Sequence, residues 1–292
     1  MKLIKPSFKI LYQPVGIDTY YYPIEWAGRT CYKSTRKDGS SVIDFAERMI
    51  KSGHLSVLEH GTVFLDFHDL EPFDKSWLID FYRNNPYSQV CGSYVTTNYR
   101  VIVENKDNGI GKESLKAISK QTMYHPRRWM VKFIVDRGIS HELVRHRKFS
   151  FCQESTRYCN YNNTNKFGDD ITFIIPHHLE SVISDNTIIK DDNITVPADA
   201  TVFLKSLLAA ENNYKELTGT YNWKPEEARQ VLPNALKTEL IMTGFESDWK
   251  EFFKLRSSIA KTGKPHPDLV RLTDSLMHIM LKTNMINYSH DQ

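Results

Sequence analysis

The spacing of apolar residues is the feature that most constrains the fold, because it changes along the chain from strand-like to helical. Apolar and polar residues alternate over 129–135, and 63–67 and 171–175 are short apolar runs, as in strands. The stretches 202–217 and 267–280 instead repeat apolar residues at helical spacing. Strands mix with helices early and helices dominate late. We therefore expect an α+β fold with a central mixed or antiparallel sheet flanked by helices and a helical C-terminal half.

Capping and turn residues predict further elements. Ser41 precedes a helix from Val42 that ends at Gly53, and Pro225 suits the first turn of another helix. The remaining expectations are a helix from Asp74, a strand over 99–104, a helix from Ser140 into Arg147, a helix over 236–242, and a helix over 248–256 capped by Ser247.

Length and composition limit the class of protein. A chain of 292 residues is near the upper limit of what one hydrophobic core covers, so we expect one domain over 1–292. No apolar run is long enough to span a membrane, the N-terminus lacks a signal-peptide pattern, and none of the four cysteines forms C-x-x-C. A reduced, cytoplasmic protein without a membrane partner is expected.

The charge balance also argues against one class of partner. Lys and Arg number 38 and Asp and Glu number 35, for a formal net charge of +3. A broadly basic nucleic-acid coat is therefore not expected, although a local basic site remains open.

The densest polar cluster is Arg145-His146-Arg147-Lys148. If these residues continue a helix, the first three side chains sweep roughly 200°, so one ligand on one face cannot use them all. Two arginines so close suit a phosphate, because the guanidinium fork matches phosphate oxygens. A solvated basic helix end is the equally simple alternative.

A second cluster runs from Gly53 to His60. His54 and His60 stand six residues apart, a spacing that does not fit a zinc-binding helix, so no metal site is expected. Ser56 and Glu59 form S-x-x-E, which is a candidate helix-capping box.

The third cluster, Trp249, Phe252, Phe253 and Arg256, forms one helical stripe of three aromatic residues followed by a cation. Such a stripe is usually core with the arginine reaching solvent. The alternative is an arginine held against a planar ring inside a pocket, where it would need an anionic partner.

Read together, these clusters resemble the flavin-dependent thymidylate synthases. The family signature is R-H-R, seven residues and then S, and here Arg145–Arg147 is followed by Ser155 and by Thr156-Arg157-Tyr158. Segment 27–32 resembles the family's A-A-R-x-C-Y, and segment 53–60 resembles its G-H-x-S/T-x-x-E-H. Segments 228–233 and 252–256 match two further blocks, and the resemblance covers about 15–67 and 129–285.

The resemblance implies an activity. The family methylates dUMP to dTMP, with methylenetetrahydrofolate as carbon donor and with FAD and NADPH as reductants. It is a homotetramer with shared active sites. Arg256 would be the catalytic residue, facing uracil and favouring ionisation of its N3. The implied FAD contacts are His54, Ser56, Glu59, Arg145, His146, Arg147 and Gln153. The implied dUMP contacts are Glu142, Arg145, Gln153, Glu154, Ser155, Thr156, Arg157, Arg229 and Arg256.

The chain departs from the family at four places. Residues at about 68–128 form an insert between two blocks; Glu142 stands where the family often has Gln; and Gln153 stands where it often has Glu. No N-x-R segment precedes the aromatic stripe. The alternative functions are a nucleotide-binding family member without methylation activity, or a nucleic-acid-binding module that uses the basic cluster.

Overall fold

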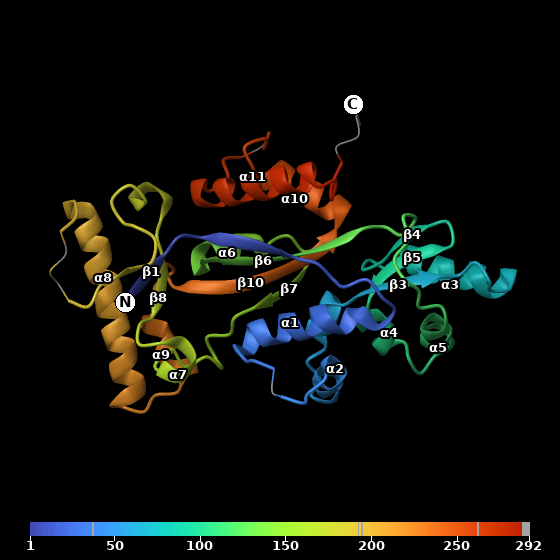
Figure 1. The fold of residues 1–292 in the computed structure, drawn as a ribbon, viewed down its shortest axis with the longest axis horizontal. Helices are drawn as coiled ribbons and strands as arrows, with labels where there is room; N and C mark the ends of the chain where they lie inside the picture. Colours follow the sequence, from blue (N-terminus) through green and yellow to red (C-terminus); the bar gives the residue numbers. More distant parts are fainter. Residues whose placement is uncertain (37, 192, 194, 262, 288–292) are drawn as a thin grey trace.

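The computed structural model describes residues 1–36, 38–191, 193, 195–261 and 263–287. Three small sheets follow one another along the long axis of the molecule, with helices on both sides (Figure 1). The α+β fold expected from the sequence is confirmed. No helix in this part of the chain is both long and apolar enough to cross a bilayer.

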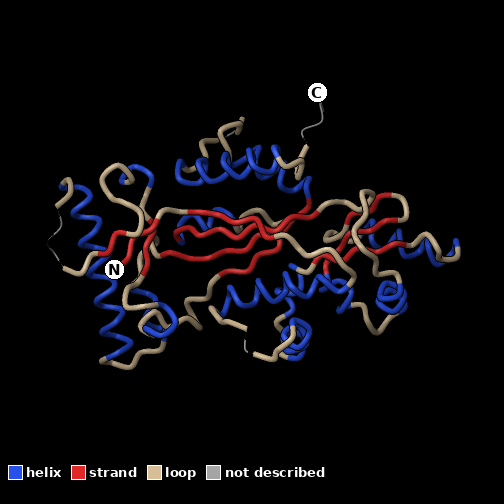
Figure 2. Tube along the Cα trace, viewed as in Figure 1, coloured by secondary structure: helices blue, strands red, loops and turns tan. Residues whose placement is uncertain are grey.

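The central sheet is antiparallel, with strand order β2-β6-β10-β7. Its strands are β2 (Ser7–Leu11), β6 (Arg128–Asp136), β7 (Ser150–Gln153) and β10 (Lys237–Phe245). Strand β10 pairs with β6 along its whole length and with β7 along four residues. Figure 2 shows these strands in the middle of the molecule.

One face of the central sheet, here called the α10 face, packs against two C-terminal helices and one short helix from the middle of the chain (Figure 1). The elements on this face are α6 (Arg137–Leu143), α10 (Glu246–Arg256) and α11 (Pro267–Lys282). Val131 and Phe133 of β6 and Leu240 of β10 are fully buried in this core beside Trp249 and Phe253.

The opposite face, here called the α1 face, packs against the N-terminal helices. These are α1 (Tyr21–Tyr32), α2 (Val42–Lys51) and the 3-10 helices η1 (Asp18–Tyr20) and η2 (Leu55–His60). Cys152 and Ile241 point to this side and join a core with Ile24 and Ala27 of α1. Side chains that alternate along β10 thus separate two cores.

The expected insert forms one end of the molecule together with β3. Its sheet has the order β3-β5-β4. The elements are β3 (Thr62–Asp66), α3 (Pro72–Asn84), β4 (Gln89–Cys91), β5 (Tyr94–Asn98), α4 (Tyr99–Glu104) and α5 (Gly109–Lys116). Leu78, Tyr82 and Ile102 share a core with α1, so this region is packed into the fold. That it is an insertion remains a prediction.

The other end holds a small mixed sheet of order β8-β1-β9. The elements here are β1 (Lys2–Ile4), α7 (Thr164–Phe167), β8 (Thr172–Ile174), η3 (His177–Leu179), β9 (Thr187–Ile188), α8 (Ala198–Gly219), α9 (Pro225–Ala228) and η4 (Arg229–Val231). Helix α8 covers the core around Phe173 and Tyr214.

Three secondary-structure expectations are wrong. Residues 236–242, expected as helix, lie mostly in the central strand β10, whose burial on both faces removes the alternation typical of a half-exposed strand. Residues 99–104 form a helix because the Asn98 side chain accepts a hydrogen bond from the Val101 N–H. Helix α6 is capped by Asp136, not Ser140, and ends at Leu143.

Two other capping expectations have different outcomes. Ser41 does cap α2, in a reciprocal capping box with Asp44. Ser247 does not cap α10, since the N–H of Phe245 donates to Asp248 instead. The candidate box of Ser56 and Glu59 is absent, because η2 begins after His54 without a side-chain cap.

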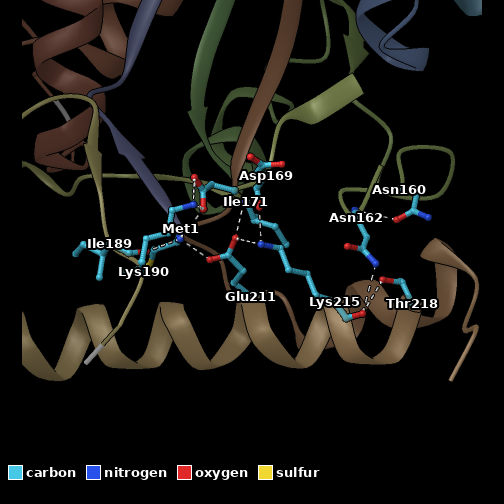
Figure 3. A network of polar contacts seen from close by, with 11 residues as sticks. Met1, Asn160, Asn162, Asp169, Ile171, Ile189, Lys190, Glu211, Lys215 and Thr218 are labelled. Atoms are coloured by element: carbon cyan, nitrogen blue, oxygen red, sulfur yellow. Dashed lines mark hydrogen bonds and ion pairs between the residues drawn. The ribbon is translucent and has the colours of Figure 1, made fainter. Parts of the chain in front are cut away.

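A buried carboxylate fastens α8 to the N-terminal sheet (Figure 3). Glu211 is 2% exposed, accepts a hydrogen bond of 2.7 Å from the Ile171 N–H, and pairs with Lys215 at 2.8 Å. Its second oxygen lies 2.6 Å from the α-amino group of Met1. One buried carboxylate therefore pairs with two cations and accepts from a backbone donor, and Asp170, 3.2 Å from the α-amino group, supplies a second negative charge.

Replacing Glu211 by Gln is expected to lower the free energy of unfolding by about 3 kcal/mol, because the buried α-amino group and Lys215 each lose an ion-pair partner. Urea unfolding measures this change. Glu216→Gln, an exposed position on the same helix, is the control and should stay within about 0.5 kcal/mol of the parent. Equal stability of the two variants would contradict this role of Glu211.

Candidate functional site

Arg256, His146 and Glu142 form a polar group on the α10 face. The Nε of Arg256 donates to Nε2 of His146 at 3.0 Å, and its Nη1 donates to Glu142 Oε2 at 2.8 Å. Arg256 is the last residue of α10. The three aromatic residues of the stripe, Trp249, Phe252 and Phe253, are buried in the core, and Arg256 lies at the edge of that core. The sequence predicted Glu142 and Arg256 as dUMP contacts and His146 as an FAD contact, and the fold brings these three side chains together.

His146 is held as an uncharged acceptor. Burial and the neighbouring Arg256 cation lower the pKa of His146 to about 4. Its ring packs edge-on against Phe252 with centroids 4.9 Å apart. Because Arg256 donates to Nε2, this nitrogen must carry the lone pair, and the proton of the neutral ring sits on Nδ1.

A cavity of about 570 Å³ opens next to Glu142. It lies between α6, the segment after β8 and the start of α11, and His177, His178 and His266 line it together with Asp136 and Asp268. These histidines were not predicted from the sequence, since they belong to no motif block and come together only through the fold. Burial raises the pKa of Asp136, whose carboxylate also caps α6. No three metal-ligating side chains cluster among the described residues.

Tyr32, His54 and Tyr158 form a second group, on the α1 face. The Tyr32 hydroxyl lies 2.6 Å from His54 Nδ1, and the rings of Tyr32 and Tyr158 have centroids 5.5 Å apart. They line an open cavity of about 540 Å³. Burial raises the pKa of Tyr32. Three of the sequence blocks therefore converge here.

Arg157 and Arg229 continue this second group. Arg157 stacks over the Tyr158 ring at 5.4 Å and pairs with Glu226 of α9 at 2.8 Å. Arg229 donates to the Thr156 hydroxyl at 3.3 Å. The hydrogen bond with Arg157 lowers the pKa of Glu226.

Ser155 is fixed beside these arginines. Its N–H donates to the Cys31 carbonyl at 3.0 Å, and its hydroxyl accepts from the Arg157 N–H at 3.3 Å. Backbone and side chains of the S-T-R-Y block are thus tied to the end of α1 and to α9.

Other candidate residues stand apart from both groups. Arg145 and Arg147 are exposed in a turn after α6, with no carboxylate partner among the residues described. They are not helical, so the expected 200° sweep does not apply to them. Ser56 is exposed, and Glu59 pairs with Arg100 at 2.7 Å.

Gln153 and Glu154 are committed to internal contacts. Gln153 donates to Ser140 at 2.8 Å on the α10 face. Glu154 is 1% exposed, accepts from the Tyr161 hydroxyl at 2.8 Å, and pairs with Lys237 at 2.7 Å. In the single chain, neither side chain is directed at an open binding surface.

The central sheet separates the two polar groups. Arg256, His146 and Glu142 belong to elements of the α10 face, whereas Tyr32, His54 and Arg157 are tied to α1 on the other face. A single chain therefore does not bring Arg256 into a common cavity with Arg157 and Arg229.

Known proteins resemble this chain over most of its length. It is 24% identical over 247 residues to the flavin-dependent thymidylate synthase of Mycobacterium sp. (strain JLS), covering 80% of this chain and 67% of the relative. The enzyme of the same name from Mycobacteroides abscessus is 22% identical over 241 residues, covering 80% and 66%. The chain spans about two thirds of the length of these relatives.

Solved structures give weaker similarity. The UMP/dUMP methylase PolB from Streptomyces cacaoi bound with 5-Br dUMP superposes with a TM-score of 0.45 and 14% identity, covering 97% of this chain and 93% of PolB. ThyX from Helicobacter pylori complexed with FAD and dUMP gives a TM-score of 0.39 and 15% identity, covering 96% of each chain.

A family model supplies the decisive comparison. The model described as "Thymidylate synthase complementing protein" matches residues 104–263, which is more than half of the chain. The match spans the Arg-His-Arg turn, the S-T-R-Y block, Arg229 and Arg256. The resemblance found in the sequence is thus confirmed, and the chain belongs to the thymidylate synthase complementing protein family.

Proposed function

We propose that this chain is a flavin-dependent thymidylate synthase, a methyltransferase that converts dUMP to dTMP. The observation that carries the proposal is the family match, which covers the first polar group and, in the second, Arg157, Tyr158 and Arg229. The name shared by the curated relatives supports the same activity. Methylenetetrahydrofolate would supply the carbon, and NADPH the reducing equivalents through FAD.

The residues present suit a flavin nucleotide. Arg145 and Arg147 are exposed cations without a carboxylate partner in the described part of the chain, which suits phosphate oxygens. Tyr32, His54 and Tyr158 line a cavity with aromatic edges, which suits a planar ring system. Bound FAD, once reduced, would supply a hydride to the pyrimidine, so no cysteine nucleophile is assigned.

In this proposal Arg256 acts on the uracil ring. Glu142 and His146 fix two edges of its guanidinium, so the cation is oriented before substrate arrives. A cation facing the uracil carbonyl and N3 would stabilise negative charge on the ring. Glu142 remains a proposed dUMP contact that must then share Arg256 with the substrate.

Arg157, Arg229, Ser155 and Thr156 are proposed to hold the dUMP phosphate. Arg157 is 60% exposed and paired with a half-exposed Glu226, so a phosphate can replace that carboxylate at small cost. Ser155 acts here as a ligand, because its hydroxyl bonds a backbone N–H and no histidine lies against it in the described contacts.

A shared site between subunits reconciles these roles with the fold. If the α10-face group of one subunit met the α1-face group of another, pyrimidine and phosphate contacts would complete one site. We therefore include a homotetramer with shared active sites in the proposal. We also propose a cytoplasmic location. The proposed partners are the nucleotide and folate, without nucleic acid or membrane.

Two other functions give different outcomes. A family member without methylation activity would bind dUMP but release no label from its C5. A nucleic-acid-binding module would bind oligonucleotides with steep salt dependence, which the near-balanced charge of the chain does not favour.

The proposed activity predicts that the purified protein is yellow and that dUMP perturbs its flavin spectrum. Tritium release from 5-labelled dUMP should require FAD, methylenetetrahydrofolate and NADPH together. A colourless protein that FAD cannot restore would contradict the proposal. Bound flavin and dUMP without tritium release would favour the inactive family member.

The neutral state of His146 predicts a pH dependence of stability. Its pKa in the folded protein, about 4, is below the ordinary value near 6.5, so the unfolded chain binds more protons between these values. The free energy of unfolding should therefore fall as pH drops from 6.5 to 4. His146→Gln should make this dependence shallower, as measured by urea unfolding at each pH.

His141→Gln is the matched control, because His141 is an exposed histidine on α6, the helix that ends three residues before His146. It should leave the pH dependence unchanged. If His146→Gln and His141→Gln gave the same slope as the parent, His146 would not be held neutral by its contact with Arg256.

A further inference from the structure

A large basic cavity lies on the α1 face of the central sheet, outside both polar groups. Its volume is about 1150 Å³, roughly twice that of the cavity beside Glu142. It lies between α1 and strands β2, β6 and β10. Charged side chains around it are Lys9, Lys132 and Glu239 from the sheet, Arg29 and Lys33 from the end of α1, and Lys166 from α7.

The floor of this cavity contains two like charges in direct register. Lys9 of β2 is the cross-strand partner of Lys132 of β6. Like charges directly opposite one another destabilise a sheet. Lys132 is relieved by an ion pair with Glu239, but Lys9 has no carboxylate partner among the described residues. Lys9 is therefore an exposed lysine at the edge of the cavity that has no counter-ion in the described part of the chain.

The carboxylates around the cavity are already shared among several cations. Glu239 pairs with Lys33, Lys132 and Lys237, and Glu154 pairs with Lys33 and Lys237. Burial alone would raise the pKa of Glu239, but Lys237 and Lys33 hold it well below its usual range. These acids cannot neutralise Lys9 or Lys166 as well.

The same sharing occurs at the end of α1. Glu25, which is 2% exposed, pairs with both Arg29 and Arg36. Five cations therefore line the cavity against the single carboxylate of Glu239, an excess of four positive charges among the lining residues. The whole chain has a net charge of only +3, so this excess is concentrated here.

The basic cavity adjoins the proposed nucleotide site. Lys166 Nζ donates to the carbonyl of Tyr32 at 2.8 Å, and the Tyr32 hydroxyl contacts His54 on the other side. Lys33, which follows Tyr32 in the chain, adopts a left-handed backbone conformation with φ of 46°. Its ammonium group pairs with Glu239 in the wall of the cavity. Trp26 adds a half-buried aromatic surface to the wall.

We propose that the basic cavity binds the anionic part of a co-substrate of the proposed reaction. The ligand chemistry is a small organic polyanion, whose phosphates or carboxylates would lie between Lys9 and Lys166. Two co-substrates carry such groups: NADPH through its phosphates, and a folate through a chain of glutamyl carboxylates. The inference rests on the proposed function and adds a binding site to it.

The test uses the FAD-loaded protein with dUMP bound. Lys9→Gln/Lys166→Gln removes two cations that have no carboxylate partner in the described contacts. Lys112→Gln/Lys205→Gln, at two exposed positions away from the cavity, is the charge-matched control. Calorimetry measures the binding of NADPH and of tetrahydrofolate carrying one or four glutamyl residues.

The cavity variant is expected to bind one of these polyanions roughly tenfold more weakly than the control, with FAD content and dUMP affinity unchanged. Loss of NADPH affinity would identify phosphates as the ligand groups, and loss confined to the tetraglutamate would identify the folate tail. Equal affinities of variant and control for all three probes would overturn the proposal.

This experiment distinguishes a wrong function from a wrong co-substrate site. A parent protein that binds neither FAD nor dUMP would refute the proposed function. A parent that binds both, with a cavity variant indistinguishable from its control, would refute only the co-substrate site.

Discussion

The pairing of β10 on both of its edges is the constraint on which the rest of the structure depends. This strand joins β6 along its whole length and β7 along four residues, and it separates the hydrophobic cores on its two faces. The segment carrying Arg229 leads into it, and α10, which ends at Arg256, follows it directly. One strand therefore fixes the positions of both arginines.

The two faces of the sheet differ in how they balance charge. On the α10 face, Arg256 is oriented by one carboxylate and one neutral imidazole, and its helix is buried in an aromatic core. On the α1 face, arginine and lysine outnumber the acids that pair with them. The first arrangement suits a fixed contact with a neutral ring, and the second suits anionic groups that arrive and leave.

Much of the fold could be predicted from the sequence wherever an element is half buried. The alternation over 129–135 and the helical spacing over 267–280 describe elements with one buried face, and both predictions are confirmed. The central strand β10 was missed because burial on both faces gives a continuous apolar run. The helix at 99–104 depends on one side-chain cap at Asn98, a local signal weaker than the run of β-branched residues beside it.

The sequence identified individual candidate residues of the site, but not which of them lie together in space. The motif blocks supply Arg256, His146 and Arg157, yet which of them share a face follows from strand order and register, which no local pattern contains. His177, His178 and His266 belong to no block and meet only because η3 and α11 are neighbours in space. Like-charged partners such as Lys9 and Lys132 likewise become visible only through the register of β2 and β6.

The central claim is that one active site takes Arg256 from one subunit and Arg157 from another. Mixing subunits tests it most directly: Arg256→Gln and Arg157→Gln proteins, each expected to be inactive alone, are co-expressed and assayed for tritium release from 5-labelled dUMP. Mixed assemblies should regain activity, because some of their sites then contain both native arginines. Mixed assemblies that hold FAD but remain as inactive as either variant alone would contradict the account.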